Sequence, residues 1–372
     1  MTSEAPNNQP NRIYVCPGCG GNQVYDARGS CLSCPYCGRE EQIPQTEREI
    51  KEYSYEEYLK PRPEALKKLA PDAMSAHCAS CGATVTFTAT EFADACPFCG
   101  TSIVTQPQVA DPTVAPEAVL PFRLTQQQAS AGVRSWIGSR WFAPSALKRL
   151  SSQSSISGVY LPYWVYASGT TSYYTGERGE HYYETESYEE TDQDGNTVSR
   201  TRQVQRTAWY AAAGTVIDWF ENVLICGTNS LHENHQKRLG PWDLSRLRPF
   251  DPAYLSGFKA QIYQVDVAQG FEGAKEEMAG QISEDVRRDI GGDEQRIFNI
   301  STAYYAITFK YILLPIYLAA YWFNQKTYQV LVNADTGEVR GDRPYSAVKI
   351  ALLVVVILAV LALLYLYFSH KH

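Results

Sequence analysis

Cysteine is the residue type in this sequence whose number and spacing most clearly indicate chemistry. Eight of the ten cysteines form two groups, and each group has two C-x2-C pairs separated by fourteen residues. The groups are Cys16, Cys19, Cys34 and Cys37, followed by Cys78, Cys81, Cys96 and Cys99. Four thiolates at this spacing are typical of a closed tetrahedral zinc site. We therefore expect two zinc ribbons with one structural Zn2+ ion each, and Cys31 is left over.

A glycine follows the second cysteine of every pair, at Gly20, Gly38, Gly82 and Gly100. A turn that points its backbone amides at thiolate sulfur needs a positive φ at this position, and glycine adopts it at least steric cost. The rival pair Cys31 and Cys34 is followed by Pro35, which cannot adopt a positive φ. Disulfides are the alternative interpretation, but they need an oxidising compartment, and the spare Cys31 and Cys226 argue against one.

The length and charge of the chain narrow the class of protein. At 372 residues the chain is long enough for two or three domains. Its net charge of -7 is unlike that of a nucleic-acid-binding protein, which usually carries a basic patch. The 26 tyrosines, many in alternating runs, indicate β-sheet, where the ring packs and the hydroxyl reaches water.

The C-terminal stretch 350–368 contains nineteen apolar residues without a charge. As a helix it would be about 28 Å long, enough to cross the hydrocarbon of a bilayer. A buried core helix is the alternative, which so long an apolar run at the end of the chain disfavours. Arg340, Arg343 and Lys349 precede the run, and the N-terminal "MTSEAPNNQPNR" lacks the apolar core of a signal peptide. We expect a transmembrane helix over 348–368 in the inner (plasma) membrane, with the bulk of the chain in the reducing cytoplasm.

These signals predict an α+β protein with two N-terminal zinc ribbons, a duplicated β-α-β-β domain and one C-terminal transmembrane helix. The predicted segments are zinc ribbon 1 at 12–48, a helical connector at 49–71, zinc ribbon 2 at 72–104, a linker at 105–120 and the duplicated domain at 121–345.

Two halves of the main domain repeat one order of elements. The first is predicted as a strand at 120–125, a helix at 126–141, and a strand, a turn and a strand within 158–176. The second is a strand at 262–267, a helix at 273–290, and strands within 310–341 around turns at Asn324 and Asp335–Gly337. Both halves place Leu-Pro before aromatic residues, at Leu161–Pro162 and Leu314–Pro315, which suggests a shared bend.

Two stretches of the main domain have alternative interpretations. The run 311–323 is apolar, but its thirteen residues include Pro315, so a buried strand is favoured over a second membrane span. The segment 179–210 is predicted as a hairpin that turns at Asp194–Gly195 and places Glu189 opposite Arg200. Ion pairs between its arms would mainly fix the register, and a partner-binding arm is the alternative.

Catalytic motifs are missing from the sequence. It contains neither the phosphate loop G-x-x-x-x-G-K-[ST], nor H-E-x-x-H, nor G-x-S-x-G. His232 and His235 form a close histidine pair, and we interpret them as a solvated pair on a helix. Cys226 follows an apolar run and is interpreted as a buried core thiol. The chain is therefore predicted not to be an enzyme.

The charges around the cysteines bear on what the ribbons bind. No lysine or arginine lies between Asp72 and Val104, and the first ribbon holds four arginines against four acidic residues. Because phosphate binding needs cations, a protein partner is favoured over nucleic acid.

Four features resemble a known family: "GVYLPYWVY", "FKYILLPIYLAAYW", "VNADTGEVRGDRPYS", and the C-terminal span behind two C-x-x-C-G ribbons. The family comprises bacterial membrane-anchored tandem zinc-ribbon proteins, often labelled primosomal-helicase-like or as carrying a transcription-factor-IIB-type zinc ribbon. The resemblance covers nearly the whole chain and implies that the eight ribbon cysteines bind zinc. The helicase label conflicts with the missing nucleotide loop. Similar proteins associated with phage-shock-protein-A-like and flotillin-like membrane-stress systems imply a docking role.

The function favoured by the sequence is a non-enzymatic adaptor or scaffold that docks a protein partner at the cytoplasmic face of the membrane, in the response to membrane stress. The alternative is a membrane-tethered zinc-ribbon protein that binds nucleic acid.

Overall fold

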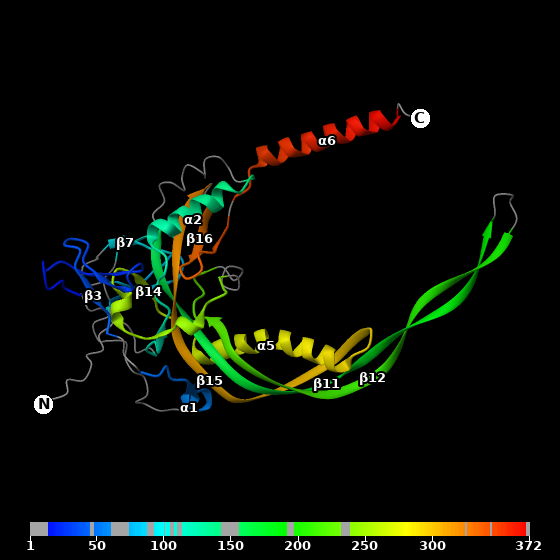
Figure 1. The fold of residues 1–372 in the computed structure, drawn as a ribbon, viewed down its shortest axis with the longest axis horizontal. Coiled ribbons are helices and arrows are strands. Elements are labelled where there is room, and N and C mark those ends of the chain that lie inside the picture. The colour runs from blue at the N-terminus through cyan, green and yellow to red at the C-terminus, as the bar shows by residue number, and fades with distance from the viewer. Residues whose placement is uncertain are drawn as a thin grey trace.

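The computed structural model shows a mixed α+β fold (Figure 1). It describes all of the chain except residues 1–13, 45–47, 61–73, 88–92, 100, 105–107, 110–113, 143–155, 192–196, 232–238, 324–325, 343 and 370–372. Two groups of four cysteines, a large sheet and one apolar C-terminal helix make up the described fold. The predicted fold class is therefore confirmed.

The large sheet is built around two long antiparallel strands, β11 (Ser157–Thr191) and β15 (Glu294–Phe323). They pair along most of their length, from Ser157 opposite Leu318 to Gly179 opposite Glu294. The other strands of the main domain add to these two, directly or through a neighbouring strand. These are β10 (Ala118–Val119), β12 (Thr197–Cys226), β13 (Arg248–Pro249), β14 (Lys259–Gln261), β16 (Lys326–Asn333) and β17 (Val339–Gly341).

The order of the elements repeats, as predicted from the sequence. The first unit is β10, α2 (Gln126–Gly138), β11 and β12, and the second is β14, α5 (Val267–Ile290), β15 and β16. β10 pairs in parallel with β15, and β14 pairs in parallel with β11. The short strand of each unit therefore pairs with the long strand of the other unit. The two units therefore interlock within a single sheet.

The Leu-Pro pairs lie at the centre of this duplication. Leu161 is directly opposite Leu314, which are the equivalent residues of the two units. At Pro162 the outer neighbour of β11 changes from β14 to β12, and at Pro315 that of β15 changes from β10 to β16. The proline carbonyls accept from Gly227 N at 2.8 Å and Ala334 N at 3.1 Å. A proline fits there because its missing N–H faces the gap between two neighbours.

The helices begin at matching capping boxes. α5 therefore starts at Val267 and not at 273 as predicted, and the preceding strands lie earlier than predicted. Thr125 with Gln128 caps α2, and Asp266 with Gln269 caps α5. The residues just before each cap bond to one carbonyl of the other unit instead of forming a strand. Arg123 and Leu124 donate to Ala334 O, and Gln264 and Val265 donate to Gly227 O.

The helix α5 covers one face of the sheet where β11, β12 and β15 run together (Figure 1). Its buried residues recur every three or four positions and form one apolar stripe. They are Phe271, Ala274, Met278, Ile282, Val286 and Ile290. The helix ends at Gly291, whose φ of 67° suits a helix C-terminus. α2 packs on β16 and β17 by Ala129, Val133 and Ile137.

The turn predicted within 158–176 is wrong, because β11 runs through this range without interruption. Instead, both neighbours of β11 carry an extra residue beside Ala167 and Ser168. Asn222 in β12 and Ala306 in β15 have positive φ there, of 57° and 48°. Bulges on both sides bend a sheet and increase its twist. Beyond this point β11 and β12 leave the body as a long arm (Figure 1).

The predicted register of the hairpin is wrong by one residue. Glu189 lies opposite Ser199, and Arg200 lies opposite Tyr188. The last described pair, Thr191 with Thr197, encloses five residues, an odd number. A two-residue turn at Asp194–Gly195 would instead leave an even number of residues between the members of each pair. Ion pairs link the two arms as predicted, at Glu184–Arg206, Glu186–Arg202 and Glu186–Arg206, but Arg200 pairs with Glu190 and not with Glu189.

The ribbons are built from short strands. Ribbon 1 contains β1 (Val24–Asp26), β2 (Cys31–Ser33) and β3 (Glu40–Gln42), and ribbon 2 contains β5 (Met74–His77), β6 (Thr84–Phe87), β7 (Ala93–Ala95) and β8 (Ser102–Val104). The range predicted as a connector holds β4 (Tyr53–Ser54), which pairs with β15, and α1 (Tyr55–Leu59). The range predicted as a linker holds β9 (Gln108–Val109), paired with β5, and β10.

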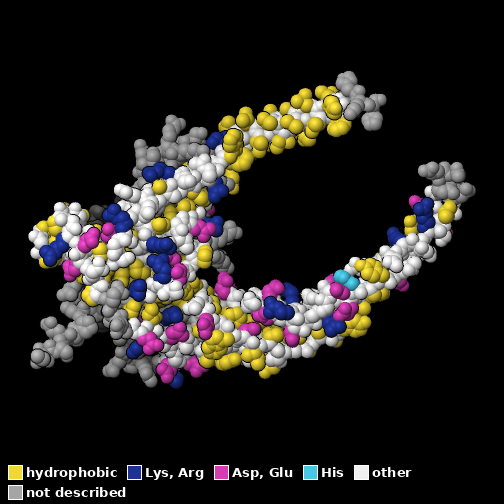
Figure 2. Space-filling view, viewed as in Figure 1, with side chains coloured by type: hydrophobic (Ala, Val, Ile, Leu, Met, Phe, Trp, Pro, Cys, Tyr) yellow, Lys and Arg dark blue, Asp and Glu magenta, His cyan; other side chains and the backbone are white. Residues whose placement is uncertain are grey.

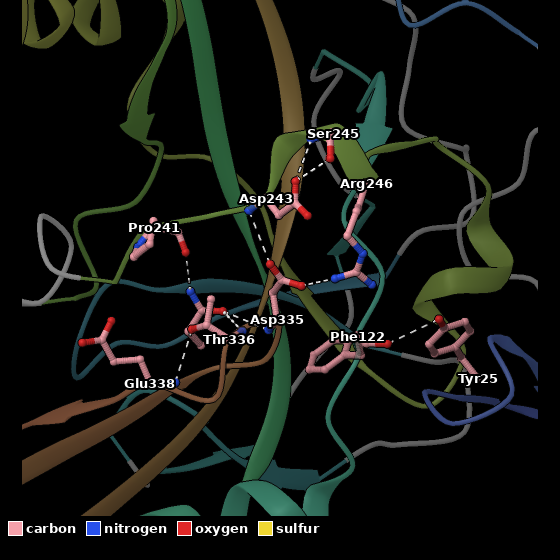
Figure 3. Close-up of polar contacts among 10 residues, drawn as sticks. Tyr25, Phe122, Pro241, Asp243, Ser245, Arg246, Asp335, Thr336 and Glu338 are labelled. Atoms are coloured by element: carbon pink, nitrogen blue, oxygen red, sulfur yellow. Dashed lines mark hydrogen bonds and ion pairs between the residues drawn. The ribbon is translucent and has the colours of Figure 1, made fainter.

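A buried acidic residue in the turn after β16 holds the segment that connects the two units (Figure 3). Asp335, whose side chain is 2% exposed, accepts from the Arg246 guanidinium and from Asp243 N. Asn333 donates to Leu239 O at 2.8 Å. The predicted turn at Asp335–Gly337 is present, with Gly337 at a φ of 84°. The turn predicted at Asn324 lies outside the described residues, although Phe323 and Lys326 pair on either side of it.

The C-terminal helix α6 (Ala347–Ser369) extends away from the body with its apolar side chains exposed (Figure 2). Among the described residues, Ala347–Phe368 is the one helix long and apolar enough to span a membrane. The run from Tyr311 to Ala319 is buried within β15, so the prediction of a strand there is confirmed.

Gly176 and Gly280 provide a test of the tightly paired sheet. A Cβ added at Gly176 would lie 2.2 Å from the carbonyl oxygen of Arg296, whereas one added at Gly280 in α5 would meet nothing within 4 Å. We expect Gly176→Ala to lower the free energy of unfolding by about 1–3 kcal/mol. Gly280→Ala should raise it by about 0.5–1 kcal/mol, through helix propensity. Thermal unfolding of the full chain in detergent measures both, and equal effects would contradict the register at Gly176.

Candidate metal centres

Each cysteine pair forms the same backbone turn. The N–H of the first cysteine donates to the carbonyl five residues later, at 2.7–2.9 Å in all four turns. The donor and acceptor pairs are Cys16 and Gly21, Cys34 and Arg39, Cys78 and Ala83, and Cys96 and Thr101. The repeated hydrogen bond shows that the equal spacing in sequence corresponds to one local geometry.

The glycine after each pair behaves as the sequence predicts. Gly20, Gly38 and Gly82 have φ values of 74°, 73° and 75°, and each N–H donates to the carbonyl of the first cysteine. Gly100 lies outside the described residues. The positive φ completes the turn and is the conformation that other residues adopt at a cost.

The turns bring four sulfur atoms together in each ribbon. In both groups all four Sγ atoms lie within 4.8 Å of one another. Cys16 and Cys37 are 3.5 Å apart, as are Cys19 and Cys34, and in ribbon 2 the two closest pairs are at 3.5 and 3.6 Å. Four thiolates around Zn2+ at 2.3 Å would be about 3.8 Å from one another. The donor set and its dimensions therefore fit one tetrahedral ion per ribbon.

The backbone around the sulfur atoms favours thiolate, the form that binds metal. The N–H of Gly18 donates to Cys16 Sγ at 3.4 Å. Backbone N–H groups of Cys37 and Tyr36 lower the pKa of Cys34 to about 6. In ribbon 2 a hydrogen bond with Cys81, together with backbone N–H groups, lowers the pKa of Cys96 to about 5. The same sulfur contacts raise the pKa of the partner thiols, that of Cys81 beside Cys96 and that of Cys19 beside Cys34.

The two cysteines outside the ribbon sets lie away from both groups of sulfur atoms. Cys31 begins β2 and is fully buried, and burial raises its pKa. Cys226 ends β12 opposite Tyr163, and burial raises its pKa to about 11. Raised values favour the neutral thiol, as expected for cysteines that pack. His232 and His235 lie outside the described residues.

Both ribbons are attached to the duplicated domain. In ribbon 1, Tyr25 is buried against Tyr254 at a ring distance of 5.6 Å, and its hydroxyl lies 3.4 Å from Phe122 O (Figure 3). In ribbon 2, β6 pairs with β14 and so joins the large sheet. The metal centres therefore lie on a continuous structure with the domain.

One side chain that the sequence analysis missed connects ribbon 2 to the second unit. Gln264 Nε2 donates to Gly82 O at 2.7 Å, directly at a metal-binding turn. Its Oε1 accepts from Thr228 Oγ1, Asn229 N and Ser230 Oγ at 2.9–3.0 Å. No signal in the sequence marks this contact, because the two partners are 182 positions apart.

A second feature that the sequence analysis missed is a surface of large apolar and aromatic side chains on the arm, which we call the arm face. One carboxylate lies at its edge, where Glu221 accepts from Trp219 Nε1 at 3.2 Å. It is the side of β11, β12 and β15 opposite α5, and its residues share that side because directly paired residues of a ladder point the same way. Its large exposed side chains are Tyr173, Ile217, Trp219 and Tyr305, which are 58, 69, 56 and 43% exposed. The residues between them are Thr171, Thr175, Ala213, Thr215, Ser301 and Ala303.

Comparison with known proteins identifies one similar protein of uncharacterized function. The chain is 23% identical over 342 residues to YdjG of Bacillus subtilis (strain 168), which covers 91% of this chain and 92% of YdjG. No family model and no solved structure matches the chain. The similarity spans nearly the full length of both proteins.

Metal analysis tests the ligand sets directly. Full-length protein purified anaerobically without chelator should contain two zinc ions per chain, and Cys31→Ser should leave this number unchanged. Cys34→Ser and Cys96→Ser should each lose one ion, because three thiolates hold a structural ion poorly. Each site should contribute about 10–16 kcal/mol of metal-coupled folding free energy. A zinc content near zero in the wild type would refute the assignment.

Proposed function

We propose that the chain is a non-enzymatic adaptor anchored in the inner membrane by α6, with its bulk in the cytoplasm, which docks a protein partner. The arm face is the observation that carries this proposal. A projecting sheet with large exposed aromatic side chains and no charge between them is suited to a protein surface, where aromatic anchors supply most of the binding free energy.

The charges of the arm support a protein partner. Outward from the arm face, Arg296 lies over the Trp209 ring at 3.6 Å and pairs with Glu177. Toward the tip, the arginines of β12 pair with glutamates of β11. These cations are already matched by acidic residues, and phosphate binding depends on cations that displace counterions.

A non-enzymatic role is supported by the cavity between ribbon 1 and α2. It has a volume of about 420 Å³ and is lined in part by Asp26, Thr125 and Lys259. The Asp26 carboxylate pairs with Arg28, and the Thr125 hydroxyl caps α2. The polar groups of the cavity therefore have structural partners, and the zinc sites are closed by four thiolates, which leaves no open coordination position for catalysis.

The resemblance to membrane-anchored zinc-ribbon proteins supports a partner of the phage-shock-protein-A-like or flotillin-like kind, acting in membrane stress. Such partners work at the membrane surface, where α6 would hold the arm. Zinc in this proposal is structural: it folds the ribbons, which in turn cover the edges of the sheet that carries the arm.

A crosslinked pull-down from membranes tests the docking surface. The double change Trp219→Ala and Tyr305→Ala should reduce partner recovery about 10-fold or more, because it removes two aromatic anchors. Tyr210→Ala is the matched control: Tyr210 is 58% exposed on the same strand but points to the opposite side. Equal recovery from both variants would refute docking on the arm face. Loss only on changing Cys78 and Cys81 to Ser would assign the docking surface to ribbon 2.

The competing function is binding of nucleic acid by ribbon 1, favoured by one observation. Tyr36 lies between two metal ligands and is 78% exposed, and Arg39 is close by in sequence. An exposed aromatic ring beside a cation can stack on a base. Because the ribbon carries as many acidic residues as arginines, we expect its dissociation constant for DNA and RNA to be roughly 0.1 mM or weaker at physiological salt. Tight binding that weakens steeply with salt in fluorescence anisotropy would reverse the preference.

A further inference from the structure

The loop after α2 lies against the first turn of α6. Ser346 N donates to Phe142 O at 2.8 Å, and Lys349 Nζ donates to Trp141 O at 3.2 Å. Trp141 and Lys349 are 208 positions apart in the sequence. The end of α2 is therefore held at the point where the apolar helix leaves the domain, as the ribbon shows (Figure 1).

The side chains at this junction are aromatic and cationic. Trp141 is 73% exposed and Tyr345 is 63% exposed. The Arg140 guanidinium lies 5.0 Å from the centre of the Trp136 ring. Tryptophan and tyrosine are enriched where a bilayer meets water, because the ring is apolar and one end forms hydrogen bonds, and lysine and arginine reach the headgroups.

The level of the membrane boundary follows from Lys349. α6 has 23 residues and is about 34 Å long, slightly more than the hydrocarbon thickness of about 30 Å. An ammonium group in the first turn of such a helix must reach the interface, because burial in hydrocarbon is costly. Lys349 Nζ donates a hydrogen bond to Trp141 O, so the backbone of Trp141 lies at the depth of this ammonium group. The exposed Trp141 indole extends from that depth.

We propose that the segment 136–142 is a second membrane contact, in which the Trp141 indole enters the phospholipid interface. This inference rests on the membrane span of the proposed function and goes beyond it. α6 by itself determines where the chain enters the bilayer. The contact at Trp141 in addition holds α2 against the membrane surface, and α2 packs on β16 and β17, so it sets the orientation of the duplicated domain and its arm.

Tryptophan fluorescence provides a direct test, because α6 contains no tryptophan. Full-length protein is reconstituted into vesicles of phosphatidylglycerol and phosphatidylcholine brominated near the headgroup end of its acyl chains. Any quenching then reports a tryptophan of the body at the interface. We expect quenching in the wild type and loss of most of it in Trp141→Ala and in Trp141→Phe, which keeps an aromatic ring. Trp219→Ala, which removes a comparably exposed tryptophan on the arm, should leave the quenching unchanged.

Each contrary outcome has a separate meaning. Resistance to alkaline carbonate extraction first establishes that α6 is integrated. An integrated protein that is not quenched, or whose Trp141 variants are quenched as strongly as the wild type, overturns the second contact and leaves the span intact. Loss of quenching in Trp219→Ala would place the arm face on the membrane instead. A chain that carbonate extracts would overturn the span and this inference together.

Discussion

The antiparallel pairing of β11 with β15 is the interaction on which the rest of the structure depends. Leu161 and Leu314 face each other at its centre, and the two β-α-β-β units are arranged around them. Trp164 Nε1 donates to Val265 O, and Tyr317, at the equivalent position of the other unit, donates to Leu124 O, each at 2.8 Å. Each long strand therefore positions, through an aromatic side chain, the residues that precede the helix of the other unit. Neither unit could bury its apolar face without the other.

The pairing also determines where the metal centres lie. Because β14 belongs to the second unit but pairs with β11 of the first, its free edge remains available, and β6 of ribbon 2 occupies it. Ribbon 1 packs its Tyr25 on the segment just before β14. Zinc binding in this arrangement would stabilise a cover on a sheet edge, and an uncovered edge strand is a site for unwanted pairing. This provides a structural reason for ribbons that have no catalytic position.

β11 and β12 extend beyond the body and form the arm, and β15 accompanies β11 as far as Gly179. The bulges at Asn222 and Ala306 turn the sheet away from the core, and α5 then covers only one of its sides. At the opposite end of the domain, α2 and α6 meet at Trp141 and Lys349. Under the proposed function, α6 would hold one end of the domain at the membrane, and the projecting arm would present its aromatic face to a partner.

Local signals in the sequence determined the two groups of four cysteines, the turn glycines and the C-terminal helix. Each depends on residues a few positions apart, so spacing and residue type are sufficient to predict it. The order of the duplicated elements was also predictable, because both copies carry the Leu-Pro signal. The sequence did not determine the bulges that replace the expected turn near Ser168, the odd register of the hairpin or the attachment of the ribbons to the sheet. Those depend on contacts between residues that are distant in sequence, such as Gln264 with Gly82 and Trp141 with Lys349. Only the tertiary structure decides these contacts, because many strand edges and carbonyls in the chain could offer the same hydrogen bonds, and the packing of the whole domain selects among them.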